Sequence, residues 1–573
     1  MKLKILKFSF AKFITFLIIS VLFVFLTYFS FLIFYNYQFF QELKKGNFNK
    51  AKTKSEQVLQ MTGFVSKLPL FTYLRQGHQT FLSFFNLKQN GEIFFKNIFD
   101  GRDSHFSQNL VTLANSYQQF EKDFNDFYKT TENLTWAKTA LSKSGYLDKF
   151  EKYSNLFFQN QILIKDLLTY APDFLNDKKT YTVLFQNNME LRATGGFMGS
   201  YGQFYFTNGK LVSKNIQDIY VPDGQLDGFV NPPKALSEAF KHGEWRLRDS
   251  NWDPDFAKAS ETISWFFDKG GVKTGDGLIA VNLEVVEDIL NTLGQIELPD
   301  YDTQIAAQNL YLIAQNEAER DFFPGSTAKK DFLQTLTNQL FLSLSNLDNQ
   351  KMITFGQILA RHLQQKNIQV NFTNPKLQAF ANQNHWTGTI NWEQNKEFNN
   401  DYFFPVDTNL SANKANCCIV KEVSQVIEDK GDYFAIKTLI KYENNSPVAD
   451  PKPPKYWGGD YKNYLRILLP LEANIKNVLI DEESFTVNQV DKRELTTEGL
   501  KEIGFFLDLE HLQTKTVEVQ YVLKKQLDNE TYQLFLPKQS GQKPYYTSVE
   551  LLTSNSSQKT KKLIDQDQMI QFK

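Results

Sequence analysis

An uncharged, strongly apolar stretch near the N-terminus limits more than any other feature what this chain can be. No side chain between Phe13 and Gln41 is charged, and residues Phe13–Tyr37 are mostly Phe, Leu, Ile and Val. About 20 apolar residues are enough to cross the core of a bilayer. We therefore expect a transmembrane helix over residues 13–37.

The residues that flank this stretch predict its orientation. Four lysines and no acidic residue precede it: Lys2, Lys4, Lys7 and Lys12. A cleavable signal peptide would have a shorter apolar core and an A-x-A-like site, and neither is found. The positive-inside rule then places a tail of residues 1–12 in the cytoplasm. We expect a single-pass protein of the cell membrane whose remaining residues lie outside the cytoplasm, with the cytoplasmic membrane as its first partner.

Charge and cysteine content exclude two classes of protein. The 573 residues carry 63 Lys and Arg against 64 Asp and Glu, a net charge of -1, and this balance argues against a nucleic-acid partner. The two cysteines, Cys417 and Cys418, are adjacent. Consecutive Cα atoms lie about 3.8 Å apart, closer than the ~4.4 Å lower edge for ordinary disulfides, so no disulfide framework is expected. Two cysteines are also too few for structural zinc.

Residue patterns predict an α+β multidomain fold with a boundary near Pro172. Residues 38–172 read as a helical stalk, because apolar residues recur at steps of four and three along a heptad seam. The seam residues are Phe106, Leu110, Leu113, Tyr117, Phe120, Phe124 and Phe127. We interpret this stripe as a helix-to-helix core.

Residues 173–385 are expected to form an α/β domain, because short strands alternate with helical patterns. The predicted strands are Thr180–Phe185, a hairpin over Gly199–Val212 with Asn208-Gly209 at its tip, and Gly277–Val281. The predicted helices are Pro233–Phe240, Pro254–Phe267, Leu283–Leu293 and Asp331–Leu347.

Residues 386–573 predict a C-terminal β-sandwich, because several short strands there alternate apolar and polar positions. The clearest are three runs: Phe434 to Tyr442, Val517 to Leu523, and Tyr532 to Leu536. Ser446–Gly459 is rich in Pro and Gly and reads as a long loop.

Only nine of the 63 basic residues are arginines, so each arginine is a candidate for work that needs a bidentate fork. In Phe185–Tyr201, Glu190, Arg192 and Thr194 are predicted to follow a strand and to precede Gly195 and Gly196. An Arg beside exposed backbone N–H groups suits a phosphate. A structural turn tied by a Glu–Arg pair explains the window equally well. Neither nucleotide-binding glycine motif is present.

A second window, Trp245–Phe256, contains Arg246, Arg248 and Asp249. Asp253-Pro254 reads as a helix start with Asp253 as N-cap. Arg248 and Asp249 suit a phosphate and its Mg²⁺, since hard carboxylate oxygens and phosphates hold this ion together. A surface cluster of ion pairs is the alternative. Arg320 is a third candidate.

The sequence resembles the bacterial domain-of-unknown-function family 4012. The residues that carry the resemblance are E-L-R-A-T-G-G-F (190–197), R-D-S-N-W-D-P-D-F (248–256), D-G-L-I-A-V-N (276–282) and W-G-G-D-Y-K-N-Y-L-R-I-L-L-P (457–470). The function of that family is not established. Its members are typically single-span envelope proteins, which is what the resemblance implies here.

The order of elements is also similar to the LytR–CpsA–Psr family, which transfers glycopolymers from a polyprenyl-pyrophosphate carrier to the cell wall. This similarity implies that Arg192, Arg248 and Arg320 grip pyrophosphate and that Asp249 approaches Mg²⁺. Two departures are visible. Ala193 and Thr194 stand where that family has an Asp, and Leu293-Gly294-Gln295 stands where two glycines are expected.

Two functions therefore stay open. The first, which we favour because the acidic residue is missing, is a non-catalytic envelope protein that binds a glycan, a lipid-linked saccharide or a protein. The second is a glycopolymer transferase, which would need Mg²⁺ at Asp249. The candidate catalytic residues are Arg192, Arg248 and Asp249. The candidate ligand-binding residues are Glu190, Thr194, Gly195, Gly196, Arg246 and Arg320.

Overall fold

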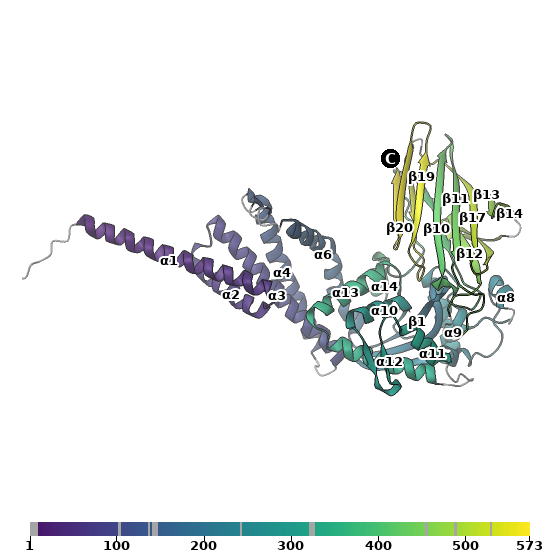
Figure 1. Cartoon of the computed structure of the whole chain (residues 1–573), viewed down its shortest axis with the longest axis horizontal. Helices are drawn as coiled ribbons and strands as arrows, with labels where there is room; N and C mark the ends of the chain where they lie inside the picture. Colours follow the sequence, from purple (N-terminus) through teal and green to yellow (C-terminus); the bar gives the residue numbers. More distant parts are fainter. Residues whose placement is uncertain are drawn as a thin grey trace, which may run out of the picture. The chain divides into compact units, whose positions relative to one another are not determined.

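The computed structural model describes residues 10–100, 105–135, 138–139, 142, 147–240, 243–319, 327–452, 457–485, 490–527 and 530–572. The chain divides into two compact units, Met1–Pro172 and Asp173–Lys573, whose elements are labelled in Figure 1. The predicted α/β and β-sandwich segments thus belong to one compact unit. Residues 1–9 of the predicted cytoplasmic tail lie outside the described residues.

The first unit is helical in the residues described. Its elements are α1 (Phe10–Lys44), α2 (Phe48–Met61), the short 3-10 helix η1 (Gly63–Val65), α3 (Pro69–Asp100), α4 (Phe106–Asn133) and α6, which continues to the start of the second unit (Leu147–Leu175). In α1, residues Ile18–Lys44 are long and apolar enough to cross a membrane, judged by length and composition.

The aromatic stripe of α4 packs between its neighbours, as the heptad seam predicts. Phe120 lies 5.7 Å from Phe84 of α3 and 5.5 Å from Phe157 of α6, measured between ring centroids. Phe124 also contacts Phe157, at 4.6 Å. Offset and edge-on contacts of this kind are favourable for aromatic rings. The stripe therefore forms the packed contact of α4 with α3 and α6.

A five-stranded mixed sheet organises the first part of the second unit, in the order β3-β2-β1-β4-β7. The strands are β1 (Lys178–Arg192), β2 (Gly195–Thr207), β3 (Lys210–Asp218), β4 (Gly277–Asn282) and β7 (Ile368–Phe372). β1 and β4 are parallel and the other pairs are antiparallel. The predicted hairpin tip is confirmed, with positive φ at Asn208 and Gly209.

Helices cover both faces of this sheet. On one face, Leu278 and Ala280 of β4 share a core with α9 (Phe256–Lys269). On the other face, Ile279 and Val281 pack with α10 (Leu283–Leu293), α13 (Asn349–Gln364) and α14 (Pro375–Gln383). Successive side chains of a strand point to opposite faces, so the alternation along β4 produces this layering.

A smaller core lies beyond α10. It joins α10 to the β5–β6 hairpin (Ile296–Leu298 and Thr303–Ile305) and to helices α11 (Leu310–Glu319) and α12 (Ala328–Ser345). The predicted α10 has the observed bounds, whereas α11, α13 and α14 were not predicted. The short elements α7 (Tyr220–Asp223), α8 (Lys234–Phe240) and the 3-10 turn η2 (Leu247–Asp249) connect β3 to α9.

The predicted N-cap of α9 is wrong by two residues. The helix begins at Phe256, and the carboxylate of Asp255 accepts hydrogen bonds from the N–H groups of Ala257 and Lys258. Its other oxygen accepts from Ile390 N–H at 3.0 Å. Asp253 instead pairs with Arg493 at 2.9 Å. Asp255 is the N-cap because its carboxylate accepts hydrogen bonds from the helix N-terminus and from the loop at the same time.

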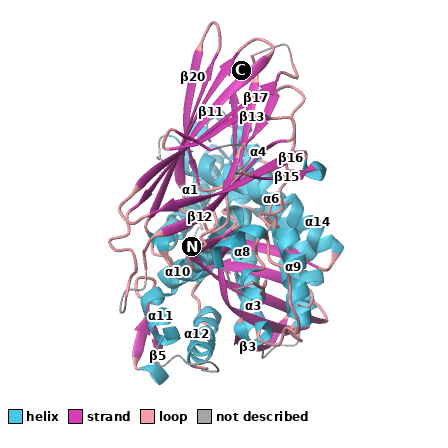
Figure 2. Cartoon of the chain, turned by 90° about the vertical axis from the view of Figure 1, so that its right-hand side faces the viewer, coloured by secondary structure: helices cyan, strands magenta, loops and turns pink. Residues whose placement is uncertain are grey.

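Three further sheets make up the rest of this unit (Figure 2). The seven-stranded sheet contains β14 (Glu483–Phe485), β13 (Asn474–Ile480), β17 (Thr514–Lys524), β11 (Tyr433–Asn444), β10 (Ile419–Asp429), β19 (Tyr545–Leu552) and β20 (Ser557–Ile564). The four-stranded sheet contains β15 (Asp491–Leu495), β16 (Leu500–Leu509), β12 (Tyr461–Pro470) and β9 (Phe404–Val406). The last sheet contains β21 (Gln568–Phe572), β18 (Tyr532–Leu536) and β8 (Asn399–Tyr402).

One apolar core connects these three sheets. It includes Ile436 of β11, Val519 of β17, Ile467 of β12, Phe505 of β16 and Leu534 of β18, each at most 2% exposed. The period-two runs predicted for β11, β17 and β18 are confirmed. The sandwich arrangement as such stays a prediction.

The expectation for the two cysteines is contradicted. The structure joins Cys417 to Cys418 in a disulfide between neighbouring residues, directly after the 3-10 turn η4 (Ala415–Cys417). Their Cα atoms lie 3.8 Å apart. The distance range used in the prediction describes disulfides between residues distant in sequence, and it does not apply to adjacent ones.

We expect Asp401 of β8 to give the second unit an acid-side pH dependence. Burial raises the pKa of this carboxyl to about 6, against hydrogen bonds donated by the hydroxyl groups of Tyr532 and Tyr521. Because the folded pKa exceeds the unfolded value of about 3.9, the folded state binds this proton more tightly. Stability from this group is therefore present below about pH 4 and is lost as the pH rises to about 6.

The Asp401→Asn variant keeps an acceptor oxygen and cannot ionise. Between pH 4 and 6 the unfolding temperature of the wild type should fall relative to that of the variant. From pH 7 to 8 the difference between the two should stay constant. A difference that is the same at every pH would contradict this assignment.

Candidate functional site

The end of β1 forms the base of the candidate site. Glu190, Leu191 and Arg192 are the last residues of the strand and are at most 4% exposed. They therefore lie in the strand, rather than in a turn after it as the sequence suggested. A register shift between Asn187 and Leu191 marks a bulge in the pairing with β2. Bulges re-aim side chains, and Glu190 lies within this one while Arg192 follows it.

The two glycines that follow are needed for packing. Gly195 has φ +128, and a Cβ there would lie 2.1 Å from Gln186 Oε1. A Cβ at Gly196 would lie 2.1 Å from the carbonyl carbon of Asn187. Thr194 is 1% exposed. None of these three predicted ligand-binding residues is among those lining the cavity described below.

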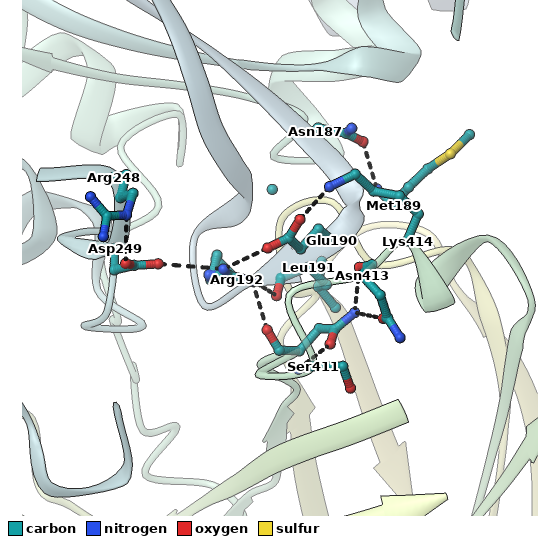
Figure 3. A network of polar contacts seen from close by, with 12 residues as sticks. Asn187, Met189, Glu190, Leu191, Arg192, Arg248, Asp249, Ser411, Asn413 and Lys414 are labelled. Atoms are coloured by element: carbon teal, nitrogen blue, oxygen red, sulfur yellow. Dashed lines mark hydrogen bonds and ion pairs between the residues drawn. The ribbon is translucent and has the colours of Figure 1, made fainter. Parts of the chain in front are cut away.

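Arg192 lies at the centre of a buried polar network (Figure 3). Its guanidinium donates to Glu190 at 2.8 Å and to the carbonyl of Asn409 at 2.7 Å. It also lies 3.4 Å from Asp249 Oδ1. The side chain is 3% exposed. The Glu–Arg pair predicted as the structural alternative is thus present, within a larger network.

Lys414 adds a second cation to Glu190. It approaches from the loop before η4, far along the chain, and forms an ion pair with Glu190 Oε2. Burial by itself would raise the pKa of Glu190, but the charges of Arg192 and Lys414 and their hydrogen bonds outweigh it, so the pKa is lowered. Glu190 is therefore a carboxylate at neutral pH.

Asp249 lies between two arginines. In Figure 3 it is flanked by Arg248 and Arg192, with 3.6 Å from Arg248 Nε to Oδ2 and 3.4 Å from Arg192 to Oδ1. Arg248 also pairs with Asp223, while burial raises the pKa of that carboxyl. The Arg248 side chain is 25% exposed, so Arg248 is more accessible than Arg192.

A cavity of about 650 Å³ opens beside this network. Its charged lining residues are four cations and three carboxylates, a net formal charge of +1: Arg192, Arg248, Lys329, Lys414, Glu190, Asp218 and Asp249. Lys329 donates to the carbonyl of Gly199 at 2.6 Å and lies 3.1 Å from Asp218. Asp223, which pairs with Arg248 but does not line the cavity, offsets the one excess cation. Cations therefore face the cavity on this side without a strong net charge, and they suit the anionic group of a ligand.

Another wall is mostly apolar and comes from three helices. The residues are Leu283 and Val286 of α10, Leu310 and Ala314 of α11, and Leu333, Leu336 and Leu340 of α12. Phe185 of β1 and Phe197 of β2 also line the cavity. The volume falls within the roughly 300–1,000 Å³ typical of small-molecule sites. Charged and apolar walls together predict an amphiphilic ligand.

The residues here do not fit the Mg²⁺ ion considered from the sequence. Both oxygens of Asp249 face guanidinium groups, and both oxygens of Glu190 face cations. In the part of the chain that the structure describes, no group of three or more His, Cys, Asp and Glu residues is placed to hold a metal. Mg²⁺ needs free oxygen ligands, so we derive no step through a metal.

The structure brings together Glu190, Arg192, Arg248 and Asp249 at one cavity. Arg246 points elsewhere, pairing with Glu244 and donating to the carbonyl of Asp223. Arg320 lies outside the described residues. Sequence reasoning missed Lys414 and Lys329. No local motif marks either lysine, because both reach the site through long-range folding.

Comparisons with known proteins identify one part of the chain. Residues 176–318 match the sequence model of a family described as "Protein of unknown function (DUF4012)", which confirms the family resemblance over that segment. No curated protein matches the chain.

Solved structures that are similar in part include B. subtilis TagV, a LytR–CpsA–Psr protein (13% identity, TM-score 0.21, covering 37% of this chain and 81% of TagV). A transcriptional regulator from Enterococcus faecalis matches at 9% identity and TM-score 0.21, over 37% of this chain and 72% of its own. An M1 zinc metallopeptidase from Deinococcus radiodurans matches at 9% identity and TM-score 0.14, over 24% of this chain and only 32% of its own. At such TM-scores these likenesses carry no argument about function.

Proposed function

We propose that this protein is anchored in the cytoplasmic membrane by α1 and binds a lipid-linked saccharide outside the cytoplasm, without transforming it. The observation that carries the proposal is the two-sided cavity, with arginines and lysines on one wall and leucines from three helices on the other. An isoprenoid or acyl chain suits the apolar wall, and a phosphate or pyrophosphate group suits the cations.

The charged wall is built for binding rather than for catalysis. Arg192 is buried, and its described hydrogen bonds go to Glu190, Asp249 and main-chain carbonyls. It therefore holds the network in place. Arg248, Lys329 and Lys414 have side chains that are 25%, 27% and 17% exposed, and these are the groups we assign to the ligand's anionic head.

Transfer of a glycopolymer from polyprenyl pyrophosphate is the alternative function. The observation in its favour is that Arg192, Arg248 and Asp249 meet at one cavity wall. Against it, both oxygens of Glu190 and both oxygens of Asp249 already face cations. The two are distinguished by incubating the full-length protein with the lipid-linked saccharide, Mg²⁺ and cell-wall glycan as acceptor. Transfer of the phosphoglycan to an acceptor hydroxyl releases polyprenyl phosphate, whereas binding alone releases none.

The test of binding uses the full-length protein in detergent with undecaprenyl pyrophosphate as the probe. We expect saturable binding that falls at least about tenfold in Arg248→Ala, a loss of about 1.4 kcal/mol. Ala314→Trp should also abolish binding by filling the apolar part. The matched controls are Arg246→Ala, outside the cavity lining, and Leu342→Trp, at an exposed site on α12.

Equal binding by Ala314→Trp and wild type would refute the location of the tail. Equal binding by Arg248→Ala and wild type would refute the location of the head. Undecaprenol has the same tail and no phosphate, so it should bind wild type more weakly than the pyrophosphate does. Its affinity should be the same for Arg248→Ala as for wild type.

A further inference from the structure

The first unit has an exposed apolar loop beside the apolar helix α1. Residues 62–68 connect α2 to α3. Phe64 and Leu68 of this loop, and Leu70 in the first turn of α3, are 77%, 53% and 54% exposed. Lys67, in the same loop, is also exposed. Large apolar side chains gathered on a surface usually mark an interaction site.

This loop packs against α1 at one level. Phe64 lies 5.3 Å from Tyr28 between ring centroids, and the Tyr28 hydroxyl donates to the carbonyl of Met61 at 2.8 Å. The next residue of α1, Phe29, contacts Phe71 at the start of α3. The loop is therefore held next to Tyr28 and Phe29 by contacts of Met61 before it, Phe64 within it and Phe71 after it.

Tyr28 is also where α1 leaves the helical bundle. From Tyr28 onward α1 is packed on one face, with Leu32 5% and Phe39 6% exposed. Before it, Val21 to Leu26 are all more than half exposed. A span of about 30 Å takes about 20 helical residues, and counted from Phe13, where the uncharged stretch begins, it ends near Leu32. The membrane-spanning part of α1 therefore ends close to the level of the loop.

Charged and polar groups next to α1 indicate which part of this helix lies in water. Lys54 of α2 lies over the ring of Tyr35, two helical turns beyond Tyr28, at 5.1 Å from the ring centre. Asn36 of α1 hydrogen-bonds His78 of α3. Lysines and a buried polar pair at this level are costly within hydrocarbon. The boundary between lipid and water therefore falls between Tyr28 and Tyr35, at the level of the loop.

We propose that residues 63–70 form a second membrane contact, in which Phe64, Leu68 and Leu70 enter the outer half of the bilayer beside α1. The proposal rests on the membrane anchoring proposed above for α1. The occupant is the lipid bilayer, because the exposed apolar surface of the loop is continuous with that of α1 through the Tyr28–Phe64 contact. Lys67 lies where it would meet anionic lipid head groups. The loop would fix the tilt of the helical unit on the membrane.

The test places a single environment-sensitive fluorophore on the full-length protein in liposomes of phosphatidylcholine and phosphatidylglycerol. Leu68→Cys is labelled with nitrobenzoxadiazole, and the native cysteines are paired in the disulfide. We expect a blue-shifted emission that is quenched by lipids with a nitroxide near the head group. Val111→Cys is the matched control, since Val111 is 58% exposed and lies near the start of α4.

Val111 is far from the loop because the start of α4 packs against the far half of α3, where Phe94 lies 5.4 Å from Phe106. The fluorophore at position 111 should show water-like emission. The variant Phe23→Cys, within α1, tests the anchor separately, and its fluorophore should be quenched by nitroxides deep in the acyl chains. Water-like emission from the fluorophore at position 23 would refute the anchor. Deep quenching at Phe23 with water-like emission at Leu68 would refute the loop contact alone.

Discussion

Replacement of Arg192 by Met should lower the free energy of unfolding of the second unit by about 3–5 kcal/mol, the range for breaking a buried ion pair. The loss arises because Glu190 and Asp249 are buried and each would keep a single cationic partner, Lys414 and Arg248 respectively. The carbonyl of Asn409 would also lose its donor. Methionine retains most of the side-chain volume, so little of the effect comes from a cavity.

The measurement is urea unfolding followed by tryptophan fluorescence. Six of the seven tryptophans lie in the second unit, and Trp136 is the exception. We expect the midpoint to fall with an unchanged slope. Arg246→Met is the control, because Arg246 is more exposed and pairs with Glu244, and surface pairs contribute about 1 kcal/mol or less. Equal effects of the two substitutions would mean that the network is not central to stability.

The double variant Glu190→Gln, Arg192→Met separates lost attraction from stranded charge. Neutralising Glu190 removes one of the two carboxylates that lose Arg192 as a partner in the single variant. The double variant should therefore be less destabilised than the sum of the two single variants, since residues in contact are not additive.

Gly196→Ala should be the second large effect, with a loss of about 3 kcal/mol or more, at the upper end for an overpacked core. The added Cβ would lie 2.1 Å from the carbonyl carbon and 2.3 Å from the oxygen of Asn187, and 2.2 Å from the nitrogen of Asn188. These are main-chain atoms of the β1 bulge, which cannot move without disturbing Glu190 and Arg192.

The matched control has the opposite expected sign. Gly356 lies within α13, and a Cβ there would meet nothing within 4 Å. Gly356→Ala should raise stability by about 0.5–1 kcal/mol, because alanine loses less backbone entropy in a helix. If Gly196→Ala melted like wild type but no longer bound the lipid probe, the glycine pair would be a ligand contact and the packing explanation would be wrong.

Local patterns predicted the parts of the fold that local physics determines. The Asn208-Gly209 turn follows from the need for positive φ, and α10 follows from its periodicity and the strand before it. The alternation along β11 predicted its buried face because one side of the strand packs on a core. The cap of α9 was misplaced because Asp253 and Asp255 look alike locally, and the loop donor Ile390 N–H is 135 residues away.

Only part of the candidate site could be predicted from the sequence. The scarcity of arginine drew attention to Arg192 and Arg248, and these two residues do lie at one cavity. Lys414, Asn409 and the apolar wall from α11 and α12 carry no motif, since their part in the site depends on how distant segments pack. The disulfide of Cys417 and Cys418 was missed because a distance rule for remote pairs was applied to neighbours.

The contacts of Arg192 also limit how the protein can be dissected. Its strongest main-chain acceptor is Asn409, and the second cation on Glu190 is Lys414. Leu191 N–H donates to the side chain of Asn416. All three partners lie beyond residue 318, where the family match ends. An excised segment covering only residues 176–318 would lose them, so the family-matched region is not a self-sufficient module. Residues 173–573 form one compact unit that keeps all of these contacts.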